Sequence, residues 1–470
     1  MNGDAARRQC VIGSLVGSIV GDALGAPFEF GDAGRYTRQL PTPRLGTHSE
    51  MTGGGLWKPG EWTDDTQMAL IVADSLVNTG GLDGLELFER FRTWANSDPA
   101  DIGIATRSVL TSHLPWNRAA TAYFRGGGLS AGNGSLMRAT PAAIWFARAP
   151  LDESMAAARV MSALTHGDPA AGEGVALFHG MIAAALNGDD PLGALPDLLD
   201  RVSADHQPKW REVLVPGWTP VPGAANGDVW STLATAVWAL RTFVPHGGTP
   251  PRIRTDFADA MRAVIDLGRD TDTVAAVTGG LIGAVLGIQA VPSRWANAVN
   301  GVVPGFTAPS GFAALQALAL RLDGEDLPKD TPHEAALTPR EVLPGLWLTN
   351  LSGLPEAPDD GFVLSLSRTR GQAGRRDSRL VYLLDGADNL HLDTVLVDVL
   401  DSIDALRAEG RSVVVHCHGG HSRTGLILRA YLRRHQGLSA SDATLRAQRL
   451  WPPTVANQPT FDEALARLTT

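Results

Sequence analysis

The sequence predicts a multidomain protein: an all-α domain followed by a small α/β domain with a central, mostly parallel sheet. The chain has 470 residues, more than one hydrophobic core usually supports. Its first two thirds are Ala- and Leu-rich stretches of helical length between Gly- and Pro-rich loops, whereas its last third alternates short apolar runs with helical patterns. Residues 323–339 are polar and proline-containing, as linkers are. We therefore expect domains at residues 1–322 and 340–470, joined by a linker at 323–339.

The first domain shows helical spacing of apolar residues throughout. Its clearest helical patterns are Gln67–Val77, Pro169–Leu186, Ser231–Thr242 and Thr273–Ile288. The apolar run near the N-terminus is interrupted by Gly13, Gly17 and the serines that follow them, so we expect a core helix there rather than a signal peptide. No stretch is expected to reach the roughly 18 apolar residues of a transmembrane helix.

The second domain is predicted from short elements of two kinds. Strand-length apolar runs stand at residues 346–348, 362–366, 380–384 and 412–416. Helical patterns at residues 392–408 and 424–435 come between and after them. Strands alternating with helices favour a small α/β domain.

Composition limits the classes of partner and compartment. The net charge of −10 argues against broad electrostatic binding to nucleic acid or to an anionic membrane. The two cysteines, Cys10 and Cys417, lie far apart in unlike contexts, which indicates neither a disulfide framework nor a cysteine-ligated zinc site. We therefore expect a protein of the reducing cytoplasm.

Two predicted helices of the first domain begin with carboxylates. Asp64 and Asp65 precede the helix at 67–77, and Asp270 and Asp272 precede the helix at 273–288. Either segment alone is more often a helix cap. Four carboxylates exceed the needs of two caps, however, and would repel one another unless a cation lay between them. Because all these groups are hard oxygen donors, they favour magnesium, manganese or calcium over zinc.

Five motifs in order over about 300 residues resemble the ADP-ribosylglycohydrolases of the dinitrogenase-reductase-activating type. They are Gly21-Asp22-Ala23-Leu24-Gly25, Trp62-Thr63-Asp64-Asp65-Thr66, Gly132-Asn133-Gly134-Ser135-Leu136-Met137-Arg138, Thr165-His166-Gly167 and Asp270-Thr271-Asp272-Thr273 with its following glycines. The resemblance implies an all-helical fold and hydrolysis of the bond joining ADP-ribose to an acceptor. It also implies a site for two Mg²⁺ ions, with Mn²⁺ as a possible substitute, at Thr63, Asp64, Asp65, Asp270, Asp272 and Thr273.

The same resemblance suggests further site residues. Glu29 follows the first helix on a loop and matches the family's catalytic or metal-linked glutamate, a general acid or base; the alternative is a surface glutamate. Residues Asn133, Gly134 and Ser135 lie in a Gly-rich loop whose N–H groups can approach an anion, and in the family this loop wraps the substrate. His166 is a candidate ligand contact, with a structural histidine as the equal alternative.

A second motif stands in the last third of the chain. A strand-length apolar run ends in His416-Cys417 and is followed by Cys-x5-Arg and a helical pattern from Thr424. Loop N–H groups at a helix N-terminus converge on an oxyanion, and the same field favours the nucleophilic thiolate of a cysteine. Gly419 and Gly420 let the backbone come close to a phosphate, and Arg423 offers a bidentate grip. The alternative is a buried, inert cysteine.

This stretch resembles the dual-specificity branch of the protein tyrosine phosphatases from about Glu341 to Leu468. The resemblance implies a Cys417 nucleophile, Arg423 as phosphate ligand and a general acid upstream, for which Asp385 is the best match and Asp388 the second. His418 and His421 depart from common versions of the loop and favour a highly anionic substrate.

We therefore predict a bifunctional hydrolase. The first domain would act on an ADP-ribosylated protein or a small ADP-ribose conjugate, and the second on a phosphorylated substrate. Two alternatives stay open for the first domain: a protein that binds ADP-ribose without turnover, and a hydrolase of another ribosyl or N-glycosidic compound. The acceptor group, the phosphatase substrate, communication between the domains and the oligomeric state are not determined by the sequence.

Overall fold

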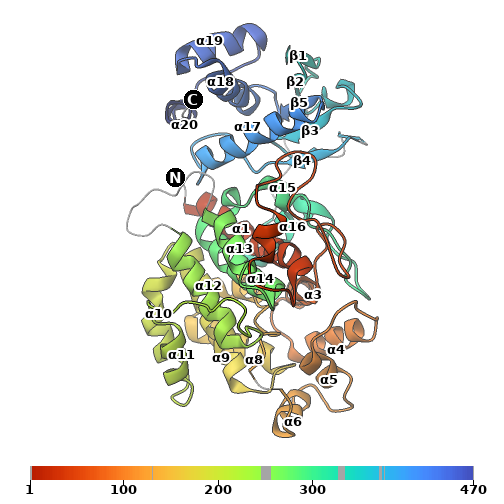
Figure 1. The fold of residues 1–470 in the computed structure, drawn as a ribbon, viewed down its shortest axis with the longest axis vertical. Helices are drawn as coiled ribbons and strands as arrows, with labels where there is room; N and C mark the ends of the chain where they lie inside the picture. Colours follow the sequence, from red (N-terminus) through yellow and green to blue (C-terminus); the bar gives the residue numbers. More distant parts are fainter. Residues whose placement is uncertain are drawn as a thin grey trace.

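The computed structural model describes residues 3–129, 131–244, 256–326, 334–369, 373–374 and 376–468. Two large hydrophobic cores organise them, and a third, smaller cluster includes Val363 and Val414 of the sheet. One core gathers buried residues from Val11 to Leu322, and another gathers residues from Val342 to Leu468. We call the parts around them the helical unit (residues 3–326) and the α/β unit (residues 334–468); Figure 1 shows the second standing at one end of the first. Much of the predicted linker, residues 327–333, lies outside the described residues.

The helical unit contains no multi-stranded sheet among its described residues, which agrees with the all-α prediction. Its helices are α1 Gly3–Gly25, η1 Ala26–Phe28, α2 Arg35–Gln39, α3 Asp64–Thr79, α4 Gly84–Ala95, α5 Ile104–Leu110, α6 Ala119–Arg125, α7 Thr140–Trp145, η2 Phe146–Arg148, α8 Leu151–Ala163, α9 Pro169–Leu186, α10 Pro191–Asp200, α11 Gln207–Val213, α12 Val229–Phe243, α13 Asp256–Ile265, α14 Thr271–Leu286, η3 Ile288–Ala290, α15 Ser293–Ala296 and α16 Gly311–Leu322.

Helices α1 and α14 pack together at backbone contact. Glycines of α1 face small residues of α14 along the whole pair, so that a Cβ built at Gly17 would lie 2.4 Å from the carbonyl oxygen of Gly279. A Cβ built at Gly279 would meet the carbonyl oxygen of Gly17 at 2.1 Å. Only residues without a side chain permit this approach. It fixes the end of α1 against the start of α14, where the predicted metal ligands lie.

Replacing Gly17 with alanine is therefore expected to destabilise the helical unit. The added methyl group overlaps backbone atoms on both sides of the pair, and relieving that overlap by moving the helices apart should cost about 3 kcal/mol of unfolding free energy. Urea denaturation measures the change. Gly81→Ala is the matched control, because a Cβ at Gly81 meets no atom within 4 Å. Equal stability of the two variants would contradict the close-packing explanation.

Among the described residues, two helices are long and apolar enough to cross a membrane by length and composition alone, so the prediction that no stretch would reach this length was wrong. They cover Gly3–Phe28 and Pro169–Leu186, and 94% and 89% of their most apolar windows are buried inside the fold. Core helices surrounded by other helices need apolar residues on every face. The expectation of a core helix at the N-terminus is confirmed.

A buried histidine on α9 makes the helical unit sensitive to acid. His179 is fully buried and its Nδ1 lies 3.4 Å from the Ser154 hydroxyl oxygen. Burial lowers the pKa of His179 to about 3, so the folded protein holds it neutral while the unfolded chain binds a proton below roughly pH 6.5. The free energy of unfolding therefore falls as the pH drops below the unfolded value.

The part of the pH dependence of unfolding free energy that is due to His179 is expected to disappear in His179→Gln. Between pH 7 and pH 5, this one residue should remove about 2 kcal/mol of wild-type stability, and the variant should lose that much less over the same interval. Urea midpoints at the two pH values measure the difference. The exposed His113, changed to glutamine, serves as control. An unchanged pH dependence in His179→Gln would disprove the assignment.

The α/β unit is built on a five-stranded sheet of order β1-β2-β5-β3-β4. Only β1 and β2 pair antiparallel; the other pairs are parallel, which agrees with a mostly parallel sheet. The elements are β1 Arg340–Leu343, β2 Leu346–Asn350, η4 Leu354–Glu356, β3 Phe362–Ser365, β4 Ser378–Leu380, α17 Leu392–Ala408, β5 Val413–Cys417, α18 Ser422–Gln436, α19 Ala440–Leu450 and α20 Pro459–Arg467. Three strand predictions match β2, β3 and β5.

The predicted strand at 380–384 was wrong, because β4 ends at Leu380. The Val381 N–H still donates to the Ser365 carbonyl of the neighbouring strand. After Val381, backbone N–H and C=O groups that would pair with a strand bond side chains instead. Leu384 N–H donates to the Asn389 side chain at 2.9 Å, and the Leu383 carbonyl accepts from Arg423 at 3.2 Å. An apolar run thus becomes a loop, residues 381–391, that lies between the two units.

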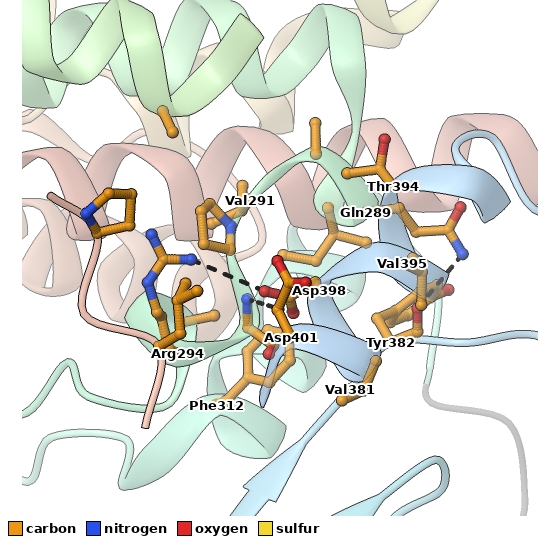
Figure 2. Close-up of a pocket in the computed structure, with 18 of the residues that line it drawn as sticks. Gln289, Val291, Arg294, Phe312, Val381, Tyr382, Thr394, Val395, Asp398 and Asp401 are labelled. Atoms are coloured by element: carbon orange, nitrogen blue, oxygen red, sulfur yellow. Dashed lines mark hydrogen bonds and ion pairs between the residues drawn. The ribbon is translucent and has the colours of Figure 1, made fainter. Parts of the chain in front are cut away.

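The boundary between the units encloses a cavity of about 250 Å³. Figure 2 shows helical-unit residues such as Gln289 and Arg294 facing Tyr382 and Asp398 of the α/β unit across it. Asp398 accepts from the Ser293 N–H at 3.2 Å, and Asn297 pairs with both backbone groups of Leu380 at 2.8 Å. The units therefore meet through directed hydrogen bonds as well as apolar packing.

Candidate active sites

The N-terminus of α3 is capped by side chains other than those of Asp64 and Asp65. Thr63 is the N-cap, and its hydroxyl accepts from the Asp65 N–H at 3.3 Å. Asp22 of α1 accepts from the N–H groups of Thr63 at 3.1 Å and Thr66 at 3.0 Å. These contacts satisfy donors that a helix N-terminus otherwise leaves without partners. Capping by their own side chains therefore does not explain Asp64 and Asp65.

The carboxylates at the start of α14 turn toward those of α3. Asp270 occupies the N-cap position but makes no side-chain cap bond; instead it accepts from the Asn133 amide at 2.8 Å. The Thr273 hydroxyl donates to Asp65 Oδ1 at 3.3 Å. The second oxygen, Asp65 Oδ2, is buried and has no hydrogen-bond partner in the structure. A buried carboxylate oxygen without a donor is costly and points to a missing partner.

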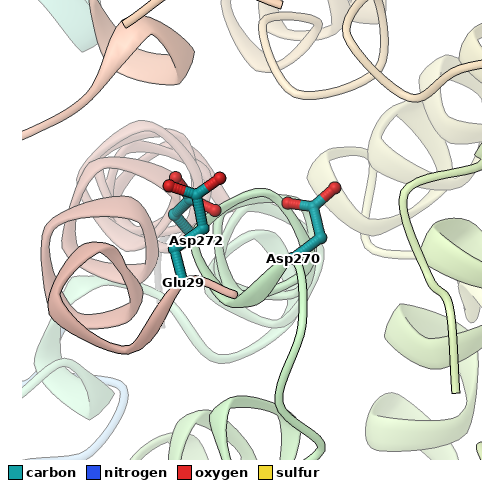
Figure 3. A group of neighbouring side chains, drawn as sticks. All are labelled: Glu29, Asp270 and Asp272. Atoms are coloured by element: carbon teal, nitrogen blue, oxygen red, sulfur yellow. The ribbon is translucent and has the colours of Figure 1, made fainter. Parts of the chain in front are cut away.

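A short backbone bridge brings Glu29 to the same place. Phe30 N–H donates to the Arg269 carbonyl at 2.6 Å, and Arg269 N–H donates to Gly31 at 3.0 Å. Phe30 and Arg269 both have positive φ, 56° and 66°, a strained conformation for residues with side chains. As a result, oxygens of Glu29, Asp270 and Asp272 all lie within 4.8 Å of one another (Figure 3).

The electrostatics of this cluster oppose full ionisation. Burial first, and then the charges of Asp101 and Asp270, raise the pKa of Glu29 to about 8. Burial and the neighbours Asp101 and Asp22 raise the pKa of Asp64 to about 8. For Asp65 and Asp272, burial and the surrounding carboxylates raise the pKa far above the ordinary value. Like charges crowded in a low dielectric favour a counter-cation or protons.

One cavity of about 330 Å³ joins the cluster to the Gly-rich loop. It is lined by the predicted residues Glu29, Asp64, Asp65, Asn133, Gly134, His166, Asp270, Asp272 and Thr273. Thr63 is fully buried behind it as the cap of α3, and Ser135 is fully buried beneath the loop, accepting from the Ser162 hydroxyl at 2.8 Å. Segments far apart in the sequence thus meet at one concave surface.

The Gly-rich loop is held in place by contacts with the start of α12. Asn133 N–H donates to Gly227 at 3.3 Å, and Val229 N–H donates to Ala131 at 2.8 Å. His166 packs against the loop, because a Cβ at Gly134 would lie 2.9 Å from its ring. Burial and Arg138 lower the pKa of His166 to about 3, so the ring is neutral.

Two acidic residues were missed as members of the site. Asp22 is fully buried behind α3, and Asp101 lines the cavity. The Gly21-Asp22 pair was visible within the first motif, and a buried aspartate in an apolar helix is a signal in itself. Asp101 gives no comparable signal, because it stands in an irregular loop whose path depends on the fold.

The second site lies where β5 ends and α18 begins. Cys417 is the last residue of β5 and is 2% exposed; the Gly420 N–H points at its sulfur at 3.2 Å. Gly420 has φ 75°, and its carbonyl accepts from the Trp451 indole at 2.7 Å, which fixes the turn. Gly419 lies in the same loop, and a Cβ there would meet the Glu334 carboxylate at 2.8 Å. Residues 417–424 thus form a turn at the start of α18, called the cradle below, in which the Gly420 N–H points at the sulfur.

Three polar atoms around this cradle have no hydrogen-bond partner in the structure: Ser422 Oγ, Arg423 Nε and Thr424 Oγ1. The other end of the guanidinium is anchored, because Arg423 donates to the Leu366 carbonyl at 2.7 Å and to Leu383. Asp385 Oδ2 lies 3.8 Å from Arg423 Nε, and the Asp385 side chain is half-exposed. The predicted residues Cys417, Gly419, Gly420 and Arg423 therefore lie on one strand–loop–helix segment, and Asp385 lies beside its arginine.

Comparisons with known proteins identify the family of the helical unit. Residues 3–331 match the family model described as ADP-ribosylglycohydrolase. ADP-ribosyl-[dinitrogen reductase] glycohydrolase of Rhodospirillum rubrum is 31% identical over 62% of this chain and 90% of its own length. ADP-ribosylarginine hydrolase Tri1 of Serratia proteamaculans is 30% identical over 60% of this chain and 73% of its own length.

Solved structures cover both units to different degrees. An ADP-ribosylglycohydrolase-related protein complex aligns with 68% of this chain and 99% of its own at a TM-score of 0.53 and 32% identity. The α/β unit has phosphatases among its neighbours, such as human DUSP28, which covers 29% of this chain and 96% of its own at a TM-score of 0.26 and 23% identity. By the family match over residues 3–331, this chain belongs to the ADP-ribosylglycohydrolase family.

Proposed function

We propose that the helical unit hydrolyses the bond between ADP-ribose and an acceptor, in a reaction that depends on two Mg²⁺ ions. The observation that carries the proposal is the convergence of Glu29, Asp64, Asp65, Asp270 and Asp272 on one cavity, with an unpartnered buried oxygen on Asp65. Oxygen-only donors of this kind fit magnesium or manganese and not zinc.

The metal-binding role falls to Thr63, Asp64, Asp65, Asp270, Asp272 and Thr273 together. Bound magnesium would supply positive charge that neutralises the crowded carboxylates, orients ribose hydroxyls and polarises water. Asn133 holds Asp270 in place through its amide, and the Thr273 hydroxyl does the same for Asp65. The chain's own contacts thus orient two of the proposed ligands.

Glu29 is the proposed proton carrier. Its carboxylate faces the cavity beside Asp270 and Asp272, on a loop fixed by the Phe30–Arg269 bridge. In hydrolysis, water adds to the anomeric carbon while the bond to the acceptor breaks. Glu29, which would be ionised when cations neutralise the carboxylates around it, takes a proton from the water, and the acceptor atom gains one. The net change is one water added across the glycosidic bond.

The Gly-rich loop is the proposed substrate surface. Gly134 exposes backbone at the cavity without a side chain, and neutral His166 can exchange hydrogen bonds with a sugar or phosphate without adding charge. Because the relative Tri1 is named an ADP-ribosylarginine hydrolase, arginine is the first acceptor to test.

The test is release of free ADP-ribose from arginine- and serine-ADP-ribosylated proteins, with magnesium and after its removal by EDTA. We expect magnesium-dependent release from at least one substrate. Tight binding of ADP-ribose without release from either would favour a binding protein. Release from another ribosyl compound alone would favour a different glycoside as substrate.

We also propose that the α/β unit hydrolyses phosphate monoesters. The supporting observation is the strand–loop–helix segment that carries Cys417, with the Gly420 N–H directed at its sulfur and with buried atoms on Ser422, Arg423 and Thr424 that have no hydrogen-bond partner in the structure. The Cys417 thiolate attacks phosphorus, the bond to the ester oxygen breaks, and Asp385 gives that oxygen a proton. Water then hydrolyses the cysteinyl phosphate and restores the thiolate.

A further inference from the structure

The loop at 381–391 carries the proposed general acid, Asp385, and little of it is held by regular structure. It joins β4 to α17 and contains no helix or strand. Its internal contacts come mainly from one side chain: the Asn389 amide donates to the carbonyls of Leu384 at 3.0 Å and Gly386 at 2.9 Å. A general acid must lie within hydrogen-bond reach of the leaving oxygen, so an unanchored loop would lose much of its effect.

Two glutamines of the helical unit supply the missing anchors. Gln9, on α1, donates to the Asp388 carbonyl at 2.7 Å and accepts from the Leu390 N–H at 3.2 Å. Its amide therefore grips the loop backbone on both sides of Asn389. Gln9 is fully buried, which makes each of these bonds costly to lose.

Gln289, in η3, grips the same loop from the neighbouring turn. It donates to the Asn389 side-chain oxygen at 2.6 Å and to the Tyr382 carbonyl at 3.3 Å, a contact drawn in Figure 2. Its own oxygen accepts from the His391 N–H at 2.8 Å. Gln289 is 4% exposed. The Asn389 side chain, which bonds the loop backbone on either side of Asp385, is thus itself held by Gln289 of the helical unit.

The remaining side of the loop reaches the phosphate cradle. Arg423 donates to the Leu383 carbonyl at 3.2 Å, and its Nε lies 3.8 Å from the Asp385 carboxylate. The loop is therefore fixed at one face by the proposed phosphate ligand and at the other by the helical unit. Gly287, which ends α14, leaves room for this contact, since a Cβ there would lie 2.9 Å from the Leu390 side chain.

We propose that Gln9 and Gln289 are positioning residues for the phosphatase reaction: through them, the ADP-ribosylglycohydrolase unit completes the active site of its neighbour by holding the Asp385 loop over Arg423. This inference rests on the proposed phosphatase function. Neither glutamine touches the reacting atoms, so the expected defect is specifically in protonation of the leaving group.

The experiment uses the full chain and two aryl phosphates. Para-nitrophenol leaves easily without a proton, whereas phenol needs one. In Gln9→Ala/Gln289→Ala, kcat should fall about 3-fold with para-nitrophenyl phosphate and about 50-fold with phenyl phosphate, within the range for loss of a general acid. The alkaline limb of the kcat–pH profile should flatten. Gln316→Ala, a buried glutamine elsewhere in the helical unit, is the matched control and should leave the ratio unchanged.

A double-mutant comparison sharpens the result. In an Asp385→Asn background, the glutamine replacements should cause no further loss with phenyl phosphate, because the group they position is gone. Hydrogen exchange at Leu390 and His391 should accelerate at least about 10-fold in the glutamine variant while α18 is unchanged.

The outcomes separate the two proposals. An active wild type whose glutamine variant loses both substrates equally, or loses neither, would overturn the positioning role and leave the phosphatase function standing. A wild type inactive toward both substrates would overturn the phosphatase function, and the positioning role with it.

Discussion

Asp272→Ala is expected to lower magnesium-dependent release of ADP-ribose by about 1000-fold or more while leaving phosphate-ester hydrolysis unchanged. Asp272 is 2% exposed, and its carboxylate lies within the cluster formed with Glu29 and Asp270. Removing it takes away one of the charges that would hold a divalent cation, and with it the charge stabilisation that such a cation supplies. Initial rates of ADP-ribose release at saturating and limiting magnesium measure the effect.

Two controls make this expectation specific. Asp74→Ala removes a carboxylate from the outer face of α3, where it pairs with Arg90 and is 57% exposed, and should keep full activity. Wild-type activity lost in EDTA should return with magnesium or manganese. Full activity in Asp272→Ala, or activity indifferent to EDTA, would contradict the proposed metal site.

Cys417→Ser is expected to reduce phosphate-ester hydrolysis at least about 10⁴-fold and to leave ADP-ribose release intact. The serine hydroxyl is a far weaker nucleophile than a thiolate, so the phosphoryl-enzyme intermediate would not form. Rapid acid quenching of the wild type with a labelled phosphate ester should find the label on Cys417.

The second cysteine provides the matched control. Cys10 is partly buried on α1, where burial raises the pKa of its thiol to about 11. Cys10→Ser should therefore retain hydrolysis of phosphate esters. Loss of activity in Cys10→Ser, or label on a residue other than Cys417, would show that the nucleophile has been misassigned.

Local pattern was enough to find several of the longest helices and most of the parallel strands. Apolar spacing predicted α9 with its observed bounds and placed α3, α12 and α14 to within a few residues. The strand predicted at 380–384 was wrong beyond Leu380. A strand needs backbone N–H and C=O groups that pair with a neighbouring strand, and here those of Leu384 and Leu383 bond the side chains of Asn389 and Arg423. The spacing of apolar residues indicates which side chains are buried, but it does not indicate the hydrogen-bond partners of the backbone.

The sequence by itself determined the chemistry: carboxylates in excess of capping needs at two helix starts, and a cysteine six residues before an arginine between a strand and a helix. The tertiary structure decided which groups meet. The packing of α1 against α14, together with the Phe30–Arg269 bridge, brings Glu29 to the start of α14, and hydrogen bonds with Thr63 hold Asp22 at the start of α3. Packing of the two units places Gln9 against a loop 379 residues away. Residues next to one another in the chain determine where a helix or loop begins. Contacts between distant segments depend instead on which surfaces are buried together, and the spacing of residues in the sequence does not reveal this.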